Sequence, residues 1–219
     1  MTKSAETAHD LVVFGATSFV GQILTRYLLE TYGVGKSVKW AIAGRSESKL
    51  NALKSELGDN GKDLPVILAD ASDEAALKSM CEQTRVIIST VGPYALYGEP
   101  LVRVCAETGT DYCDLTGEVQ WIAAMLEKYE DQAKQSGARI VHCCGFDSIP
   151  SDMGTYFLQQ QARARFKAPA TRVKMRVKVA KGGVSGGTVA SMMNIAEEAG
   201  KDPALRKKLA NPYLLCPPD

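Results

Sequence analysis

Short apolar runs alternate with amphipathic stretches of helical length over the first two thirds of the chain. The runs are continuous and apolar, as expected for parallel strands that helices cover on both faces. They lie at Leu11–Phe14, Val38–Ala43, Val66–Ala69, Val86–Thr90, Tyr112–Asp114 and Arg139–Cys143. The predicted helices are Phe19–Thr31, Ser48–Leu57, Glu74–Glu82, Glu99–Glu107 and Val119–Gln135. Joined by right-handed crossovers, these elements predict an α/β fold with a Rossmann-type doubly wound parallel sheet.

The pattern changes after Cys144. A loop leads into a predicted helix, Arg172–Val179 alternates as a strand with one solvated face, and a Gly-rich turn enters another helix. We expect residues 1–144 to form the Rossmann domain and residues 145–219 to begin a second, α+β domain for substrate binding or dimerisation. The ending "NPYLLCPPD" has no closing element, which indicates a truncated domain of a longer protein. Arg172–Val179 either pairs across a homodimer interface or is an internal strand of an interrupted sheet.

The charge balance argues for a small-molecule or protein partner. Lys and Arg total 26 against 25 Asp and Glu, and this even balance is not typical of nucleic-acid-binding proteins. No stretch approaches the ~18 apolar residues of a membrane span, and "MTKSAETAHD" lacks the apolar stretch of a secretory signal. Six cysteines without a C-x-x-C pair and only two histidines indicate reduced thiols and no metal site. We therefore expect a cytoplasmic protein.

The stretch "LVVFGATSFVGQIL" holds a glycine-containing turn between the first strand and the first helix. In a dinucleotide site the first glycine allows the tight turn, the second the approach of the pyrophosphate, and the third close packing of helix and strand. Those positions are Gly15, Ser18 and Gly21. A serine hydroxyl and the amides at the helix N-terminus can still meet a phosphate. The alternative is an ordinary turn with Thr17 or Ser18 as the N-cap.

The end of the second strand predicts NADP rather than NAD. An NAD site places a carboxylate here for the ribose hydroxyls, whereas an NADP site uses Arg for the 2′-phosphate. Arg45 occupies the position, and Ser46 adds a hydroxyl; the alternative is a solvated loop charge. Asp70, at the end of the third strand, is placed either to accept from the adenine amino group or to cap a helix.

Polar clusters follow the next three strands as well. Gly92 and Pro93 turn the chain after the fourth strand and bring Tyr94 and Tyr97 to the edge where open α/β sheets bind ligands. For the two tyrosines, packing of the loop is the alternative. The blocks "DYCDLTGE" and "CCGFDSIPSD" end the fifth and sixth strands, and the second contains Asp147. Their convergence on one edge predicts a ligand site there.

The blocks "VVFGATSFVGQ", "WAIAGRS", "STVGPYALYGEPLVRVCAETGTDYCDLTGE" and "GFDSIPSD" carry a family resemblance. In this order they resemble the saccharopine dehydrogenase-like oxidoreductases, which include trans-acting enoyl reductases of bacterial lipid biosynthesis. The resemblance covers roughly residues 10–155 and continues more weakly into Ser185–Ser191. Members of this family usually have glycine where this chain has Ser18, and they are longer.

The resemblance implies an NADP-linked oxidoreductase with a lipid-like substrate, and relatives of this kind include membrane-associated enzymes, so peripheral membrane association is also an expectation. We expect hydride transfer from NADPH to an enoyl or imine-type bond, with the protein supplying orientation. Tyr94, Tyr97 and Asp147 are the candidate proton donors, with an N-cap as the alternative role for Asp147. The residues expected to line the cofactor are Gly15, Thr17, Ser18, Phe19, Val20, Gly21, Arg45, Ser46, Asp70, Val91, Gly92 and Pro93.

A second hypothesis comes from another functional class. The chain can be an NADP-binding sensor or scaffold without turnover, which binds lipid surfaces or partner proteins. Ser18 in the phosphate loop and the lack of a Tyr-x-x-x-Lys pair favour this alternative. The sequence leaves the substrate, the direction of the reaction and the oligomeric state open.

Overall fold

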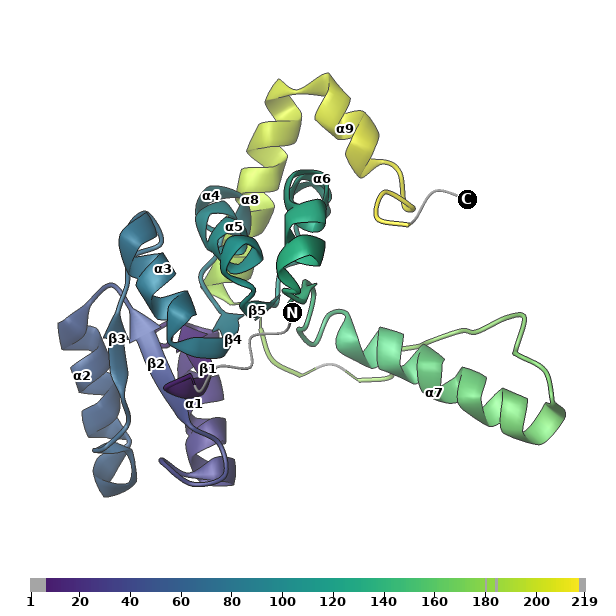
Figure 1. Ribbon diagram of the computed structural model, residues 1–219. Helices are drawn as coiled ribbons and strands as arrows, with labels where there is room; N and C mark the ends of the chain where they lie inside the picture. The colour runs from purple at the N-terminus through teal and green to yellow at the C-terminus, as the bar shows by residue number, and fades with distance from the viewer. Residues whose placement is uncertain (1–6, 180, 184, 217–219) are drawn as a thin grey trace.

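Six parallel strands form one sheet in the order β3-β2-β1-β4-β5-β6. The computed structural model describes residues 7–179, 181–183 and 185–216 (Figure 1). The strand order reverses between β1 and β4, which confirms the predicted doubly wound sheet. The strands are β1 (His9–Phe14), β2 (Trp40–Gly44), β3 (Val66–Leu68), β4 (Thr84–Ser89), β5 (Asp111–Asp114) and β6 (Ile140–Val141).

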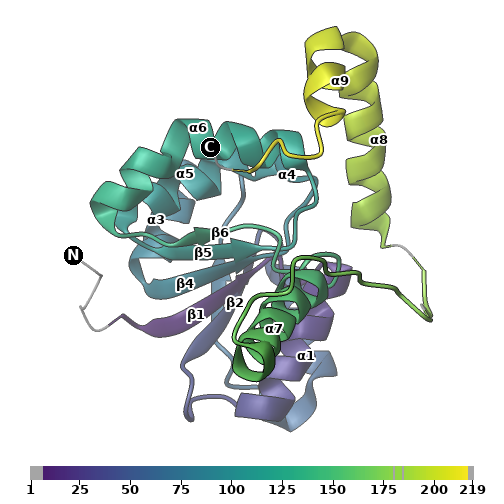
Figure 2. The same cartoon turned by 90° about the vertical axis from the view of Figure 1, so that its right-hand side faces the viewer.

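Helices cover both faces of this sheet, with α1 and α2 on one side and α3, α5 and α6 on the other (Figure 2). The five helices predicted within the sheet region are confirmed to within one residue at either end. The helical segments are α1 (Phe19–Tyr32), α2 (Glu47–Glu56), the 3₁₀ turn η1 (Gly58–Gly61), α3 (Glu74–Glu82), α4 (Tyr94–Tyr97), α5 (Glu99–Thr108), α6 (Val119–Ser136), α7 (Ile149–Phe166), α8 (Gly186–Lys201) and α9 (Pro203–Leu209).

The core consists of two apolar layers that share the sheet. Successive side chains of a strand point to opposite faces. Val12 and Phe14 therefore join the layer under α3, α5 and α6, whereas Val13 joins the layer under α1 and α2. Every residue of β2 is buried, which explains why its sequence is continuously apolar. This rigid sheet carries all the loops that form the candidate site.

The region after β6 extends away from this body (Figure 1). The predicted helices after Cys144 and after the Gly-rich turn are confirmed as α7 and α8. The predicted strand Arg172–Val179 is wrong: the segment forms no ladder with any described residue. It follows a turn that the Gln159 side chain holds, through bonds to the carbonyl and amide of Ala170. Ala180, which follows the predicted strand, and Val184, in the Gly-rich turn, lie outside the described residues.

Neither α7 nor α8 buries a side chain. Their apolar residues stay open to solvent, including Phe157 at 60% exposure and Met193 at 69%.

The alternation of apolar and polar residues in Arg172–Val179 is the pattern of a strand, but a strand needs a partner for its backbone hydrogen bonds. Among the described residues, no helix combines the length and apolar character that crossing a bilayer requires.

A glycine substitution tests the packing between β1 and α1. A Cβ added to Gly21 would lie 2.8 Å from the Ala16 Cα and closer still to the Gly15 carbonyl oxygen. We expect Gly21→Ala to lower the free energy of unfolding by about 1–3 kcal/mol, measured by urea denaturation. Gly154→Ala is the control, because a Cβ there meets no described atom within 4 Å. An equal effect of the two variants would contradict the close packing at Gly21.

Candidate functional site

The turn from β1 into α1 depends on two glycines. Gly15 has a φ of +85°, and a Cβ there would lie 2.7 Å from a methyl group of Val91 and 2.8 Å from the Thr90 hydroxyl. An L-residue would therefore be strained and would also collide with the loop after β4. Gly21 lets the first turn of α1 pack against Gly15 and Ala16. Both glycines thus hold α1 with its N-terminus at the carboxyl edge of the sheet.

Ser18 caps α1, which decides between the two N-cap alternatives. Its hydroxyl accepts from the Gly21 amide at 2.9 Å and forms a 2.9 Å bond with the Thr90 hydroxyl. With φ −70° and ψ 164°, the position has an extended backbone that does not require glycine. The hydroxyl is therefore engaged inside the loop. A phosphate at this turn would instead meet the first amides of α1, which have no partner within the helix.

One groove of about 460 Å³ runs along the ends of β1, β2 and β3. The exposed Arg45 lines it at the end of β2, opposite Asp70. Asp70 accepts from the Ser72 hydroxyl at 2.6 Å and from the Ser72 amide at 2.9 Å, and these bonds lower the pKa of its carboxyl group. Asp73, rather than Asp70, caps α3. Asp70 is therefore an ionised acceptor at the wall of the groove.

A second cavity of about 320 Å³ adjoins the groove and shares Ser18, Thr90 and Gly92 with it. The start of α1 forms one wall through Phe19 and Val20. The opposite wall comes from α8, more than 160 residues away in the chain, through Thr188, Ser191, Met192 and Ile195. The groove and the cavity thus lie next to each other at the carboxyl edge of the sheet, and together we call them the depression.

Most residues predicted to line a cofactor surround this depression. Gly15, Thr17, Arg45, Asp70 and Val91 line the groove, whereas Phe19 and Val20 line the cavity. Three predicted residues line neither space and have local roles instead. Gly21 packs inside the turn, Ser46 caps α2, and Pro93 is the N-cap residue of α4.

The three candidate proton donors occupy different environments. The Tyr94 ring is buried against Trp121, with ring centroids 5.5 Å apart, and its hydroxyl donates to the Ser89 carbonyl at 3.0 Å. Burial and the nearby Asp114 charge raise the pKa of Tyr94. Tyr97 is 49% exposed and lines the groove. Asp147 lines the cavity and leaves the N-cap position of α7 to Ser148.

A buried acid that was not among the predicted site residues also lines this cavity. The Glu118 side chain is 1% exposed and accepts from the amides of Tyr94 at 2.8 Å and Ala95 at 2.9 Å. It also accepts from the Ser191 hydroxyl at 2.8 Å. The block "DYCDLTGE" indicated a polar strand end, but the partners lie 23 to 73 residues away in sequence, so no local pattern identifies this role.

Asp114 organises the neighbouring loops in a similar way. Its carboxylate accepts from the amides of Thr116 and Cys143, both at 3.1 Å, and from the Tyr112 hydroxyl at 2.9 Å. The imidazole Nδ1 of His142 lies 2.7 Å from the same carboxylate. The loops after β5 and β6 are therefore joined through one buried side chain, and the second of these loops leads to Asp147.

These features fit a phosphorylated dinucleotide. A glycine turn opens a 14-residue helix at the sheet edge, and the exposed guanidinium of Arg45 lies at the end of β2. The groove also carries a carboxylate acceptor in Asp70. Within the ranges that the structure describes, no three His, Cys, Asp or Glu side chains form a group that could hold a metal ion.

Comparison with known proteins agrees with this geometry. The model of the saccharopine dehydrogenase NADP-binding domain matches residues 11–141. A Mycobacterium tuberculosis protein, provisionally named a trans-acting enoyl reductase, is 43% identical over 208 residues, which are 95% of this chain and 49% of that protein. The trans-acting enoyl reductase of Mycobacterium bovis is 39% identical over 212 residues, 96% of this chain and 50% of that protein.

Among solved structures, the saccharopine dehydrogenase of Saccharomyces cerevisiae has a similar fold. It matches with a TM-score of 0.55 and 18% identity, over 71% of this chain and 32% of the yeast protein. This similarity concerns the fold. The chain spans about half the length of the curated relatives that it matches. The family match over residues 11–141 and the identity to these relatives establish that the chain belongs to the saccharopine dehydrogenase-like family and contains its NADP-binding domain.

Proposed function

We propose that the chain is the NADP-binding part of an oxidoreductase that transfers hydride from NADPH to an enoyl or imine-type bond of a lipid-like substrate. The adjoining groove and cavity carry the proposal, because the exposed Arg45 lines the groove, where it can meet a 2′-phosphate, and the cavity beside it has a mixed apolar and hydroxyl lining. The relatives named trans-acting enoyl reductases favour the enoyl form of the reaction. NADPH supplies the hydride, and the protein supplies orientation.

In this proposal the groove binds the adenosine half of NADPH. Arg45 pairs with the 2′-phosphate, and Asp70 accepts from the adenine amino group. The pyrophosphate lies on the turn between Gly15 and Val20, where the helix amides carry partial positive charge. Val91 and Gly92 contact the nicotinamide ribose, and the nicotinamide faces the cavity beneath α8.

Asp147 is our first candidate for the proton donor. Its side chain is exposed and lines the cavity in which the substrate would meet the nicotinamide. Tyr97 is the second candidate, at the mouth of the groove. Tyr94 is the third, because its hydroxyl already donates to a backbone carbonyl inside the protein. A donor has to reach the substrate within hydrogen-bonding distance, and this requirement sets the order.

Cofactor titrations test the proposed function. We expect NADPH to bind at micromolar concentrations, measured by its fluorescence, and NADH to bind at least tenfold more weakly. Arg45→Ala removes the guanidinium, so it should weaken NADPH binding about tenfold or more and leave NADH binding nearly unchanged. Lys54→Ala is the control, since this lysine lies in the last turn of α2 and does not line the groove.

Two results would contradict this assignment. Equal weakening of NADPH and NADH by Arg45→Ala would exclude the 2′-phosphate contact. Failure of both cofactors to bind would exclude the oxidoreductase proposal. Binding of NADPH by the full-length protein, without oxidation in the presence of any enoyl or imine substrate, would instead favour the sensor or scaffold alternative.

Ser18 provides a separate test of the phosphate loop. Since its hydroxyl caps α1, Ser18→Ala should lower the free energy of unfolding by about 1 kcal/mol, and Ser18→Gly by a few tenths. Ser37→Ala is the control, because Ser37 is exposed in the loop before β2. Urea denaturation measures both effects. Unchanged stability of Ser18→Ala would show that the hydroxyl is not needed as a cap.

The second domain and the dimer remain part of this proposal. We propose that residues 145–219 begin a substrate domain, because α8 forms one wall of the cavity and neither α7 nor α8 has a buried side chain.

The exposed apolar side chains of Met175, Val177 and Val179 are our candidate dimer surface. Sedimentation velocity should show a dimer that Val177→Glu converts to a monomer. A wild-type protein that is still monomeric at roughly 50–100 μM, a concentration at which a weak dimer would form, would exclude this surface as a dimer interface.

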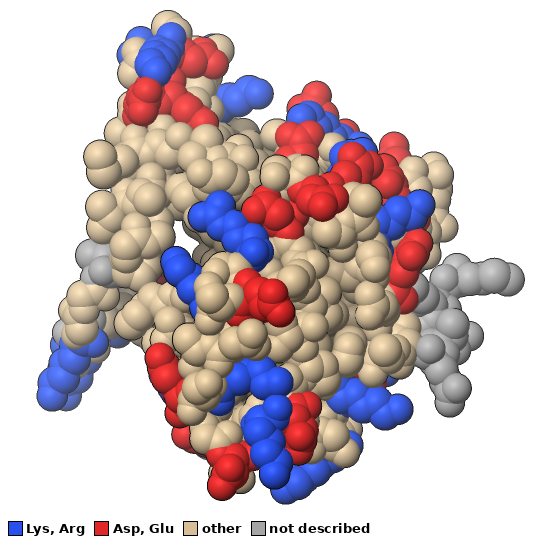
Figure 3. Space-filling model, turned by 90° about the vertical axis from the view of Figure 1, so that its left-hand side faces the viewer, with Lys and Arg blue, Asp and Glu red and all other residues tan. Residues whose placement is uncertain are grey.

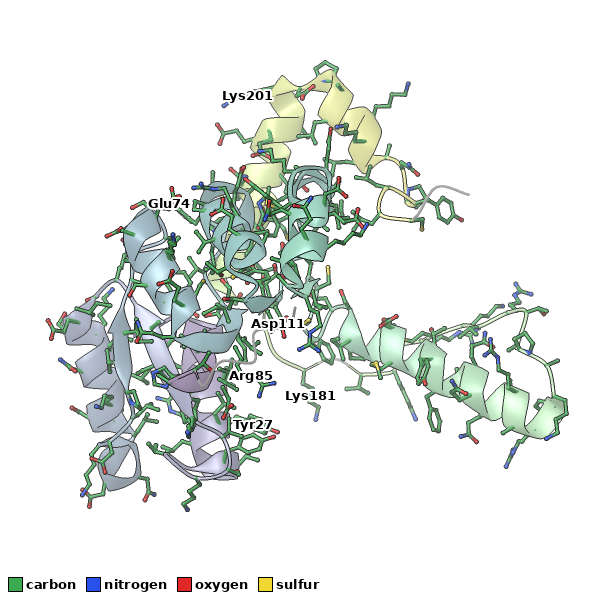
Figure 4. All side chains as sticks on the ribbon, viewed as in Figure 1. Tyr27, Glu74, Arg85, Asp111, Lys181 and Lys201 are labelled. Atoms are coloured by element: carbon green, nitrogen blue, oxygen red, sulfur yellow. The ribbon has the colours of Figure 1, made fainter. Side chains whose placement is uncertain are left out.

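A basic arm, residues 163–181, supports peripheral membrane association. No Asp or Glu occurs between residues 153 and 196, whereas the rest of the chain has 25 acidic and 18 basic residues. Figure 3 shows both signs mixed over the side of the molecule that carries α2 and α3. No arm cation forms an ion pair with a described residue, and Lys181 projects from the segment between α7 and α8 (Figure 4). The arm cations are Arg163, Arg165, Lys167, Arg172, Lys174, Arg176, Lys178 and Lys181.

Vesicle cosedimentation tests this association. Each arm cation near an anionic bilayer contributes about 1 kcal/mol, so binding to vesicles that contain phosphatidylglycerol should exceed binding to pure phosphatidylcholine more than tenfold. Changing Arg172, Lys174, Arg176 and Lys178 to Gln should abolish the difference. The matched control changes Lys36, Lys54, Lys62 and Lys78 to Gln, which removes the same charge elsewhere. Equal losses in both variants would exclude a specific role for the arm.

A further inference from the structure

Glu118 is a buried carboxylate without a cationic partner among the described residues. Its side chain is 1% exposed, and its three acceptor bonds, of 2.8 to 2.9 Å, come from two backbone amides and one hydroxyl. Burying a charge is costly unless hydrogen bonds replace the lost hydration. The two amides belong to the loop after β4, and the hydroxyl belongs to α8. The same hydrogen bonds that stabilise the carboxylate therefore also join these two parts of the chain.

The first two donors belong to the loop that follows β4. Pro93 occupies the N-cap position of α4 and makes no side-chain capping bond. Glu118 takes over this role by accepting from the amides of Tyr94 and Ala95. Gly92, two residues earlier, lines both the groove and the cavity. The carboxylate therefore fixes the loop that faces the nicotinamide end of the depression.

The third donor is the Ser191 hydroxyl of α8. Ser191 lines the cavity one helical turn beyond Thr188, and Met192 and Ile195 complete the same wall. The bond at 2.8 Å connects this wall to the Rossmann domain through a side chain that solvent does not reach. Figure 1 shows α8 rising beside α4, consistent with this contact.

We propose that Glu118 is a positioning residue, which holds the nicotinamide-side loop and α8 in one arrangement and so sets the width of the substrate cavity. The proposal rests on the proposed function. Glu118 lines the cavity, but both of its carboxylate oxygens already accept from the three donors, so we assign it no role as a proton donor. It acts through the loop and through Ser191.

Both oxygens of Glu118 are needed as acceptors, in addition to the volume of the side chain. Its Oε2 accepts from Ala95 and its Oε1 from Tyr94 and Ser191. In Glu118→Gln, one of these oxygens becomes an amide nitrogen, so one backbone amide faces another donor whichever way the side chain is oriented. A buried donor left without an acceptor is destabilising. The variant thus disturbs the loop while it keeps the volume of the side chain.

Binding of two ligands of different length distinguishes a positioning role of Glu118 from a general loss of structure in the variant. NADPH spans the groove and the cavity, whereas 2′,5′-ADP occupies only the adenosine end near Arg45. Calorimetry with the full chain should show that Glu118→Gln weakens NADPH binding about tenfold and changes 2′,5′-ADP binding less than twofold. Equal weakening of both ligands, or no change in either, would overturn the role in the loop.

Hydrogen exchange tests the connection to α8. Ser191→Ala removes only the third donor, so amide exchange in residues 186–201 should accelerate at least fivefold. Ser191→Thr keeps a hydroxyl and should restore protection. Asn194→Ala is the matched control on the same helix, because the Asn194 side chain donates to Glu198, one turn further along α8. Unchanged exchange in Ser191→Ala, or equal acceleration in Asn194→Ala, would overturn the connection.

The ligand and hydrogen-exchange tests give results that can be told apart from a failure of the proposed function. A wild-type chain that binds neither NADPH nor 2′,5′-ADP overturns the oxidoreductase proposal and the role of Glu118 in cofactor positioning. The exchange comparison of the two Ser191 variants needs no ligand. It therefore decides by itself whether Glu118 fastens α8.

Discussion

Two buried carboxylates, Asp114 in the last position of β5 and Glu118 in the loop that follows, hold the carboxyl edge of the sheet together. Asp114 joins the loops after β5 and β6, and Glu118 joins the loop after β4 to α8. Each is stabilised mainly by backbone amides and hydroxyl groups, so the loops have to adopt one conformation to satisfy the charge. The parallel sheet brings these loops to the same edge, and the hydrogen bonds to the two carboxylates fix the positions of the loops relative to one another.

Much of the sheet could be predicted because its signals are local. Each strand is a continuous apolar run, each helix has its own amphipathic pattern, and the order of elements restricts the topology. The strand predicted at Arg172–Val179 failed for a physical reason: alternation reports which faces a segment would present, but a strand exists only when a neighbour accepts its hydrogen bonds.

The candidate site was predictable where a residue's role depends on chain position. Gly15 and Arg45 follow strands directly, and both line the groove. For Ser18 the sequence allowed either a phosphate contact or a helix cap, and the bonds of its hydroxyl to Gly21 and Thr90 show that it caps α1. Glu118 was beyond prediction, because its three partners come from segments 23 to 73 residues away in sequence.

The attachment of α8 through Ser191 has a consequence for the order of assembly. All six strands and the five helices that cover them are complete by residue 141, and both glycines of the first turn have their contacts within this region. During synthesis the sheet can therefore close while α8 is still within the ribosome. The bond to Glu118 then forms last, so the cavity acquires its second wall after the cofactor groove already exists.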